Sequence, residues 1–178
     1  GHRPPSPAAE GSRLAQLDLD TGDRLWHYQV IHHDVWDWDF PCAPVLVDVE
    51  IEGRPGITKI VAQPSKQGWL YVLDRETGEP IWPIEERPVP QETNMTGDVP
   101  APTQPFPTKP APFEYQGVTI DDLLDFTPEI RAMAIEAVRD FRLGPLFTPP
   151  MQSVDGGLQG TIQRPQIGGA ASWSGAAV

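Results

Sequence analysis

A nine-residue motif occurs twice in the first half of the chain, and it constrains the fold more than any other feature of the sequence. Residues 18–26 read DLDTGDRLW and residues 74–82 read DRETGEPIW, so both fit D-x-x-T-G-x-x-x-W, 56 residues apart. Each copy follows an apolar segment, at 14–17 and at 69–73. A repeat of such length is typical of folds in which copies of one supersecondary unit stack together.

The motif predicts a β-hairpin. Its Asp can accept backbone N–H groups in the turn, and its Gly can supply the positive φ that the turn needs. Its Trp, on the returning strand, is large enough to pack against a neighbouring unit. Two coincidental turns are the alternative, but the matched flanking strands favour a true repeat, and the repeat fits the blades of a β-propeller.

Between the copies, residues 44–51 and 58–63 are expected to form strands joined by a turn at 52–56. No helix is expected before residue 120. Residues 83–116 are rich in proline and lack periodicity, which predicts a linker or an extended loop laid against a surface.

One helix is expected over residues 128–143. Thr127 is a natural N-cap, Pro128 suits the first helical position, and Gly144 with Pro145 ends the helix. Its apolar residues form a stripe that is expected to pack against the rest of the chain, with a partner site as the alternative: Ile130, Met133, Ala134, Ala137, Val138 and Phe141. A Gly-rich loop and the start of a further strand, at 176–178, are expected over residues 151–178.

Composition excludes several classes of function. A net charge of −12 argues against nucleic acid or anionic lipid as a partner, because both need clustered Lys and Arg. Cys42 is the sole cysteine, so an internal disulfide is excluded and a cysteine-based zinc site is disfavoured. No apolar stretch approaches the ~20 residues that span a bilayer. The chain reads as an internal fragment of a longer protein.

The densest polar and aromatic cluster is HHDVWDWDF at residues 32–40. Its residues leave three interpretations open: a metal site, a hydrogen-bonded loop, or a general base. The spacing gives no closed ligand set for a metal. A carboxylate flanked by Trp residues, such as Asp37, is expected to be partly desolvated, which raises its pKa towards the range useful for a base.

Two further segments hold candidate residues. Lys66 lies in PSKQGW at 64–69, on a loop between two expected strands, although most loop lysines are merely solvated. The glycines of GGAASW at 168–173 would let the backbone approach a planar ligand, a weak signal by itself.

Together these segments resemble the dehydrogenases that depend on pyrroloquinoline quinone (PQQ), and the quinoprotein glucose dehydrogenase group in particular. The resemblance covers the chain from about residue 12 to its end. It is carried by the two turn motifs and by HDVWD at 33–37, KQG at 66–68 with YVLDR at 71–75, PTQPFP at 102–107 and FTPP at 147–150.

The resemblance implies an all-β fold, part of an eight-bladed β-propeller with about two to three blades around residues 12–82. It implies oxidation of an aldose sugar or an alcohol, PQQ as hydride acceptor, and calcium or magnesium beside it. Electrons would pass to a quinone or a cytochrome. A periplasmic location also follows from it, with any membrane attachment made by other parts of the protein.

Matched by position, Asp37 would be the catalytic base and Lys66 would reach the quinone oxygens. Ser172 and Trp173 would lie beside the cofactor, by a looser match. The family's metal ligands fall outside this chain, so its metal ligands stay unknown. The family's turn motif usually has Ala two residues before the Asp, where this chain has Gln16 and Val72. The alternative function is a noncatalytic propeller that acts as a scaffold for assembly.

Overall fold

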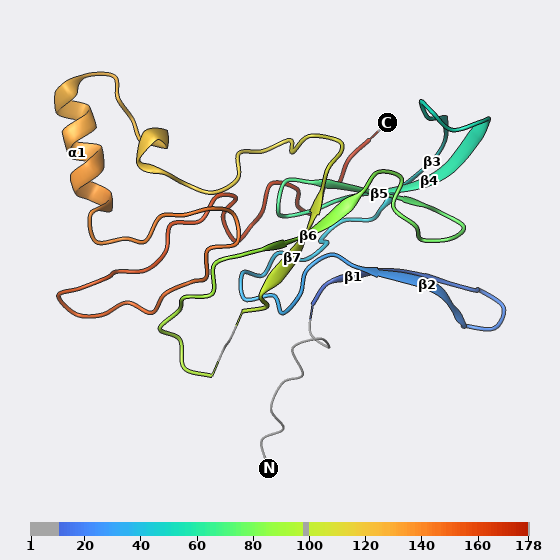
Figure 1. Cartoon of the computed structure of the whole chain (residues 1–178), viewed down its shortest axis with the longest axis horizontal. Helices are drawn as coiled ribbons and strands as arrows, with labels where there is room; N and C mark the ends of the chain where they lie inside the picture. Colours follow the sequence, from blue (N-terminus) through green and yellow to red (C-terminus); the bar gives the residue numbers. More distant parts are fainter. Residues whose placement is uncertain (1–10, 98–99, 178) are drawn as a thin grey trace, which may run out of the picture.

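The computed structural model describes residues 11–97 and 100–177, which form three small antiparallel sheets and one α-helix, with no closed barrel among them (Figure 1). This is the architecture expected for part of a β-propeller. The sheets are β1 (Arg13–Leu17) with β2 (Arg24–Gln29); β3 (Val45–Glu50), β4 (Ile57–Pro64) and β5 (Leu70–Asp74); and β6 (Ile84–Pro88) with β7 (Thr103–Pro107).

The two copies of the motif form the same turn. In the first, Asp18 Oδ1 accepts the N–H groups of Asp20 and Thr21, both at 2.9 Å. In the second, Asp74 Oδ1 accepts those of the two equivalent residues at 2.8 and 3.0 Å. Gly22 and Gly78 have φ of 77° and 75°. The expected roles of the Asp and the Gly are confirmed.

Trp26 links the two repeats. Its indole N–H donates to the carbonyl oxygen of Arg75 at 3.0 Å and also to the side chain of Gln16, the residue that departs from the family pattern. The ring lies so close to Gly78 that a Cβ there would stand 2.6 Å from a ring atom. A Trp from one repeat therefore packs on the turn of the next, as the sequence predicted.

The second copy returns differently from the first. After its turn the chain makes only an isolated antiparallel bridge, from Leu73 to Pro80, where the first copy forms strand β2. Trp82 packs on the apolar face of its own sheet, near Ile60 and Val72.

The proline-rich segment contains two strands that the sequence did not reveal, β6 and β7. Pro88, Pro105 and Pro107 all lie in alternate pairs of their antiparallel ladder. In such a ladder every second pair exchanges no hydrogen bonds, so these prolines need no N–H group there. Proline therefore masks the strand pattern without preventing the pairing.

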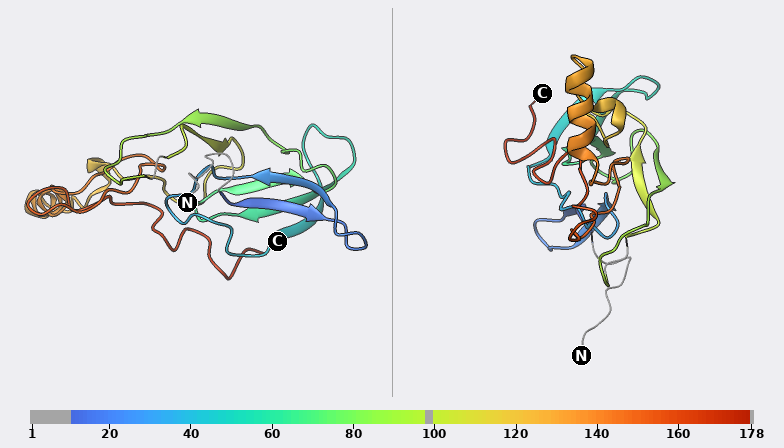
Figure 2. Two further views of the ribbon diagram at one scale, coloured as in Figure 1. Left: turned by 90° about the horizontal axis from the view of Figure 1, so that it is seen from below. Right: turned by 90° about the vertical axis from the view of Figure 1, so that its left-hand side faces the viewer.

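The helix begins as predicted but ends earlier. α1 spans Pro128–Val138, and the Thr127 hydroxyl oxygen accepts the N–H of Ile130 at 3.2 Å. The prediction that its apolar stripe packs against the chain is wrong for the described residues, because no residue of α1 is buried and Met133 is 71% exposed. Figures 1 and 2 show α1 at one end, away from the sheets.

No helix among the described residues is long and apolar enough to cross a membrane. A single turn of 3-10 helix, η1 (Ile120–Asp122), precedes α1. The strand expected at the end of the chain does not form at Ala176 and Ala177, and Val178 lies outside the described residues.

The core lies on the two faces of the β4–β5 hairpin. Successive side chains of a strand point to opposite faces, so Val72 belongs to a small cluster that β3 side chains flank, whereas Tyr71 belongs to the large cluster. That cluster joins β5 to residues 30–38, which follow β2, and to residues 146–147. Its buried members are Val30, Ile31, Trp36, Trp38, Trp69, Tyr71, Val89, Leu146 and Phe147.

Candidate active site

The loop of residues 32–40 follows β2 and is fixed by strand β7. The buried Gln104 side chain accepts the N–H of His32 at 2.8 Å and donates to its carbonyl oxygen at 2.6 Å. An amide that pairs with both backbone groups of one residue acts like a neighbouring strand. The PTQPFP motif at 102–107 therefore fixes the start of this loop.

Two Trp side chains anchor the middle of the loop in the core. The rings of Trp36 and Trp38 stack with centroids 5.5 Å apart, and the ring of Phe147 packs edge-on against both. The indole N–H of Trp36 donates to the carbonyl oxygen of Thr148 at 2.8 Å. The FTPP motif therefore supports the same loop from the other side, and both Trp rings are buried.

Asp37 lies between these two anchors and points outward. Its φ is +60°, a left-handed conformation that Asp tolerates better than most residues, and its side chain is 67% exposed. The expected desolvation of Asp37 by its Trp neighbours is therefore wrong for this chain, because alternate side chains of the loop turn inward while Asp37 turns to the surface.

Asp34 is the desolvated carboxylate of the loop. Burial raises its pKa, and the nearby charges of Asp37 and Asp39 raise it further, while N–H groups from Trp36 and Trp38 partly offset this. Because Asp34 accepts the Trp36 N–H at 2.9 Å, its role within this chain is to shape the loop.

Lys66 lies on the tight turn between β4 and β5, where Gly68 donates its N–H to the carbonyl oxygen of Ser65 at 3.1 Å. Its Nζ donates to Asp37 Oδ2 at 3.1 Å and to the Asp37 carbonyl oxygen at 2.9 Å. Asp39 Oδ1 is 2.7 Å from the same Nζ. The structure thus brings two of the predicted site residues, Asp37 and Lys66, into direct contact.

The ammonium group of Lys66 is enclosed, since its side chain is only 11% exposed. Burial alone lowers its pKa, but its hydrogen bonds to Asp39 and Asp37 outweigh burial, and the net pKa lies above the ordinary value. Lys66 therefore stays protonated at neutral pH and places a fixed positive charge beside Asp37.

The Gly-rich segment also reaches this site. Ala170 donates its N–H to the carbonyl oxygen of Lys66 at 3.0 Å, and Gly169 crosses directly over the Lys66 side chain. Ser172 lines a neighbouring hollow with Leu70 and Phe113. Trp173 is 86% exposed. Among the described residues, no hydrogen bond or ion pair joins Ser172 or Trp173 to Asp37 or Lys66.

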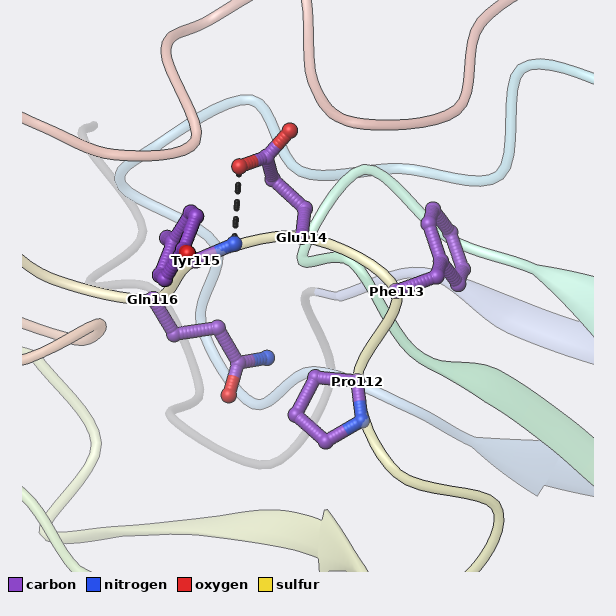
Figure 3. A pocket seen from close by; sticks show the side chains of 5 residues that line it. All are labelled: Pro112, Phe113, Glu114, Tyr115 and Gln116. Atoms are coloured by element: carbon purple, nitrogen blue, oxygen red, sulfur yellow. Dashed lines mark hydrogen bonds between the residues drawn. The ribbon is translucent and has the colours of Figure 1, made fainter.

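A third segment borders the Lys66 turn. Phe113 donates its N–H to the Gly68 carbonyl oxygen, and Gln116 donates from its side chain to the Gln67 carbonyl oxygen, both at 2.9 Å. Residues 112–116 line a hollow of about 600 Å³, in which the Glu114 carboxylate accepts the N–H of Tyr115 (Figure 3). An open concavity with polar and aromatic walls therefore adjoins the site.

Described residues 11–97 and 100–177 contain no cluster of three or more His, Cys, Asp or Glu side chains that could hold a metal ion. Asp37 and Asp39 could each offer an oxygen, but both are already engaged by Lys66. The Lys66 ammonium suits carboxylate or quinone oxygens, but Asp37 and Asp39 already accept from its three N–H groups, so a ligand oxygen would bind there by replacing one of these acceptors.

The sequence did not predict the contacts that three residues make in this site. Asp39 was passed over in favour of Asp37, although a spacing of two places both side chains on one side of an extended segment. Gln104 and Gly169 lie in the PTQPFP and GGAASW segments that the sequence singled out, but no local pattern gives their partners, which are about 70 and 100 positions away.

Comparison with known proteins identifies relatives of the whole chain. The family model for the PQQ-dependent glucose/ethanol/alcohol dehydrogenase β-propeller domain matches residues 1–178. The chain is 35% identical over its whole length to a quinoprotein glucose dehydrogenase of Escherichia coli, covering 21% of that protein. It is 32% identical over 96% of its length to a glycerol dehydrogenase large subunit of Gluconobacter oxydans, covering 22%. A quinate/shikimate dehydrogenase (quinone) of Acinetobacter baylyi is 30% identical over 91% of the chain, which spans about a fifth of these relatives.

Proposed function

Because this chain belongs to the family of PQQ-dependent glucose/ethanol/alcohol dehydrogenase β-propellers, we propose that it supplies the proton-accepting part of such an enzyme's active site. The complete protein would oxidise an aldose sugar or an alcohol with PQQ and pass electrons to a quinone or a cytochrome. The relatives named for glucose, glycerol and quinate support this substrate range.

One observation carries the proposal. An exposed carboxylate, Asp37, is held in a left-handed conformation against the protonated Nζ of Lys66, which comes from a turn 29 residues away. A noncatalytic scaffold has no evident need for this pair, whereas a dehydrogenase needs both a base and a fixed positive charge. The pair therefore favours the enzyme over the scaffold.

The two residues would have separate roles. Asp37 is exposed and anchored through its neighbours, so its carboxylate can accept the proton of a substrate hydroxyl without a change in the loop. Lys66 holds a positive charge where negative charge develops on a bound oxygen. When bound, PQQ would supply the oxidising power by accepting a hydride.

Three parts of the proposal rest on the family alone. The cation beside PQQ is proposed to be calcium or magnesium, with ligands outside the described residues. Ser172 and Trp173 are proposed to lie at the cofactor once it is bound. A periplasmic location is proposed for the complete protein.

The test is spectroscopic. PQQ and calcium are added to the purified complete protein, and glucose, glycerol or quinate is then supplied in separate cuvettes. We expect the absorbance of oxidised PQQ to be replaced by that of the reduced form with at least one substrate. If the protein binds PQQ tightly but no sugar or alcohol reduces it, the scaffold is the better interpretation.

Lys66→Ala tests the second residue in the same protein. Removing Lys66, the cation that pairs with Asp37 among the described residues, is expected to lower kcat by about a hundredfold, the effect typical of one lost electrostatic group. Lys59→Ala, which removes an exposed ion pair with Glu76, is the control and should leave kcat unchanged. Equal kinetics in the two variants would remove Lys66 from the site.

A further inference from the structure

Gly169 makes a close backbone approach to Lys66. A Cβ at position 169 would stand 2.3 Å from Lys66 Cγ, 2.5 Å from its Cβ and 2.7 Å from its Cα. Heavy atoms without a bond between them do not come so close, so no other residue fits unless the lysine moves. Gly169 also has a φ of +79°, which again favours glycine.

The segment around Gly169 is fixed by two backbone hydrogen bonds. Gly169 donates its N–H to the Gln166 carbonyl oxygen at 2.7 Å, which closes a tight turn. Ala170 donates to the Lys66 carbonyl oxygen at 3.0 Å. The turn therefore lies across the lysine as a strap of backbone, defined here as residues 166–170.

The strap covers the apolar stem of Lys66, while Asp37 and Asp39 engage its ammonium group. A lysine side chain has many rotamers, and its charge serves a reaction only while Nζ stays in one place. Covering the stem from one side and engaging the head from the other removes that freedom.

We propose that Gly169 is a positioning residue that holds Lys66 against Asp37 and Asp39. This inference rests on the proposed function for its purpose, since it assumes that the charge of Lys66 serves the reaction. The contact itself is independent of any cofactor. Ser172 and Trp173 follow the strap after a single residue, Ala171, so the strap leads directly into the predicted cofactor-side residues.

The test compares two glycine substitutions in the complete protein without PQQ. Gly169→Ala is expected to displace Lys66, whereas Gly156→Ala, at a similar φ of +69° with nothing within 4 Å of its Cβ, controls for backbone strain. The readout is the rate at which each lysine is acylated, resolved by peptide mass spectrometry. Lys59, half exposed, is the internal reference.

We expect Gly169→Ala to raise the acylation rate of Lys66 relative to Lys59 by about tenfold (1.4 kcal/mol), within the range that overpacking costs. Gly156→Ala should leave the ratio unchanged. An unchanged ratio in Gly169→Ala would overturn the proposal. A rise at both lysines would also overturn it, because it would show general loosening.

The unsubstituted protein provides a second measurement if Gly169→Ala fails to fold. There Lys66 should be acylated well below the rate of Lys59, and equal rates would contradict a strap. Because no PQQ is present, this result stands apart from the proposed function. Slow Lys66 acylation in a protein that shows no PQQ-dependent reduction would support the strap and contradict the proposed function.

Discussion

The turn at residues 18–22 and the turn at residues 74–78 have the same hydrogen bonds but different neighbours. In both, an Asp accepts two N–H groups and a Gly adopts a positive φ. Gly78 lies under the ring of Trp26, whereas a Cβ at Gly22 would meet nothing within 4 Å. The motif thus determines the turn locally, and the packing depends on which part of the protein lies beside it.

The largest expected effect is the difference in stability between Gly78→Ala and Gly22→Ala. Alanine at either position must adopt a positive φ, which costs about 1 kcal/mol. At Gly78 it must also displace the Trp26 ring, so the total destabilisation should reach about 3 kcal/mol. Urea unfolding of the complete protein, followed by Trp fluorescence, measures the difference. Equal losses for Gly78→Ala and Gly22→Ala would show that the indole does not press on the turn.

A smaller effect is expected from the indole N–H of Trp26. Trp26→Phe keeps a ring over Gly78 but removes the indole N–H that donates to the Arg75 carbonyl oxygen and to Gln16, which should cost about 1 kcal/mol. Trp82→Phe is the matched control, because Trp82 packs on an apolar cluster and none of the hydrogen bonds among the described residues uses its indole N–H. Equal destabilisation of the two variants in the same urea series would argue that only the ring matters.

The smallest effect concerns acid. Hydrogen bonds from Thr21 and Asp20 lower the pKa of Asp18; at Asp74 burial opposes but does not outweigh the bonds from Thr77 and Glu76, and its pKa is also lowered. A carboxylate whose pKa is lower in the folded than in the unfolded state stabilises the fold above about pH 4. This contribution to stability is lost as the pH falls through the folded-state pKa.

Replacing Asp18 or Asp74 with Asn removes the carboxylate that titrates in that turn. The thermal midpoint of Asp18→Asn or Asp74→Asn should therefore fall less steeply than that of the parent between about pH 4 and pH 2. A parent and variants with parallel acid profiles would mean that these carboxylates are not held by the turn.

Residues whose partners are close in sequence were predictable. The turns, the Thr127 cap and the strands β3 to β5 follow from local patterns that a few residues set. β6 and β7 were hidden because proline at alternate ladder positions looks like a loop until the partner strand is known. The packing of α1 was mispredicted because an apolar stripe does not say what lies beside it.

The site shows the same division. The polar and aromatic composition of residues 32–40 indicated a candidate site, and the family resemblance distinguished Asp37 from the other carboxylates. No pattern could place Lys66 against Asp37 or Gly169 over Lys66, because those contacts arise when three distant segments pack around the aromatic core. The sequence therefore indicated which residues could take part in the site, but it did not predict how distant segments bring them together.

The most direct test of the account is Asp37→Asn in the complete, PQQ-loaded protein. Asn tolerates the same left-handed backbone and cannot accept the proton, so the loop should stay intact while the base is lost. Asp20→Asn, in the exposed first turn, is the control. We predict that Asp37→Asn lowers kcat by about a thousandfold with PQQ binding unchanged. Turnover equal to that of Asp20→Asn would contradict the claim that Asp37 is the base.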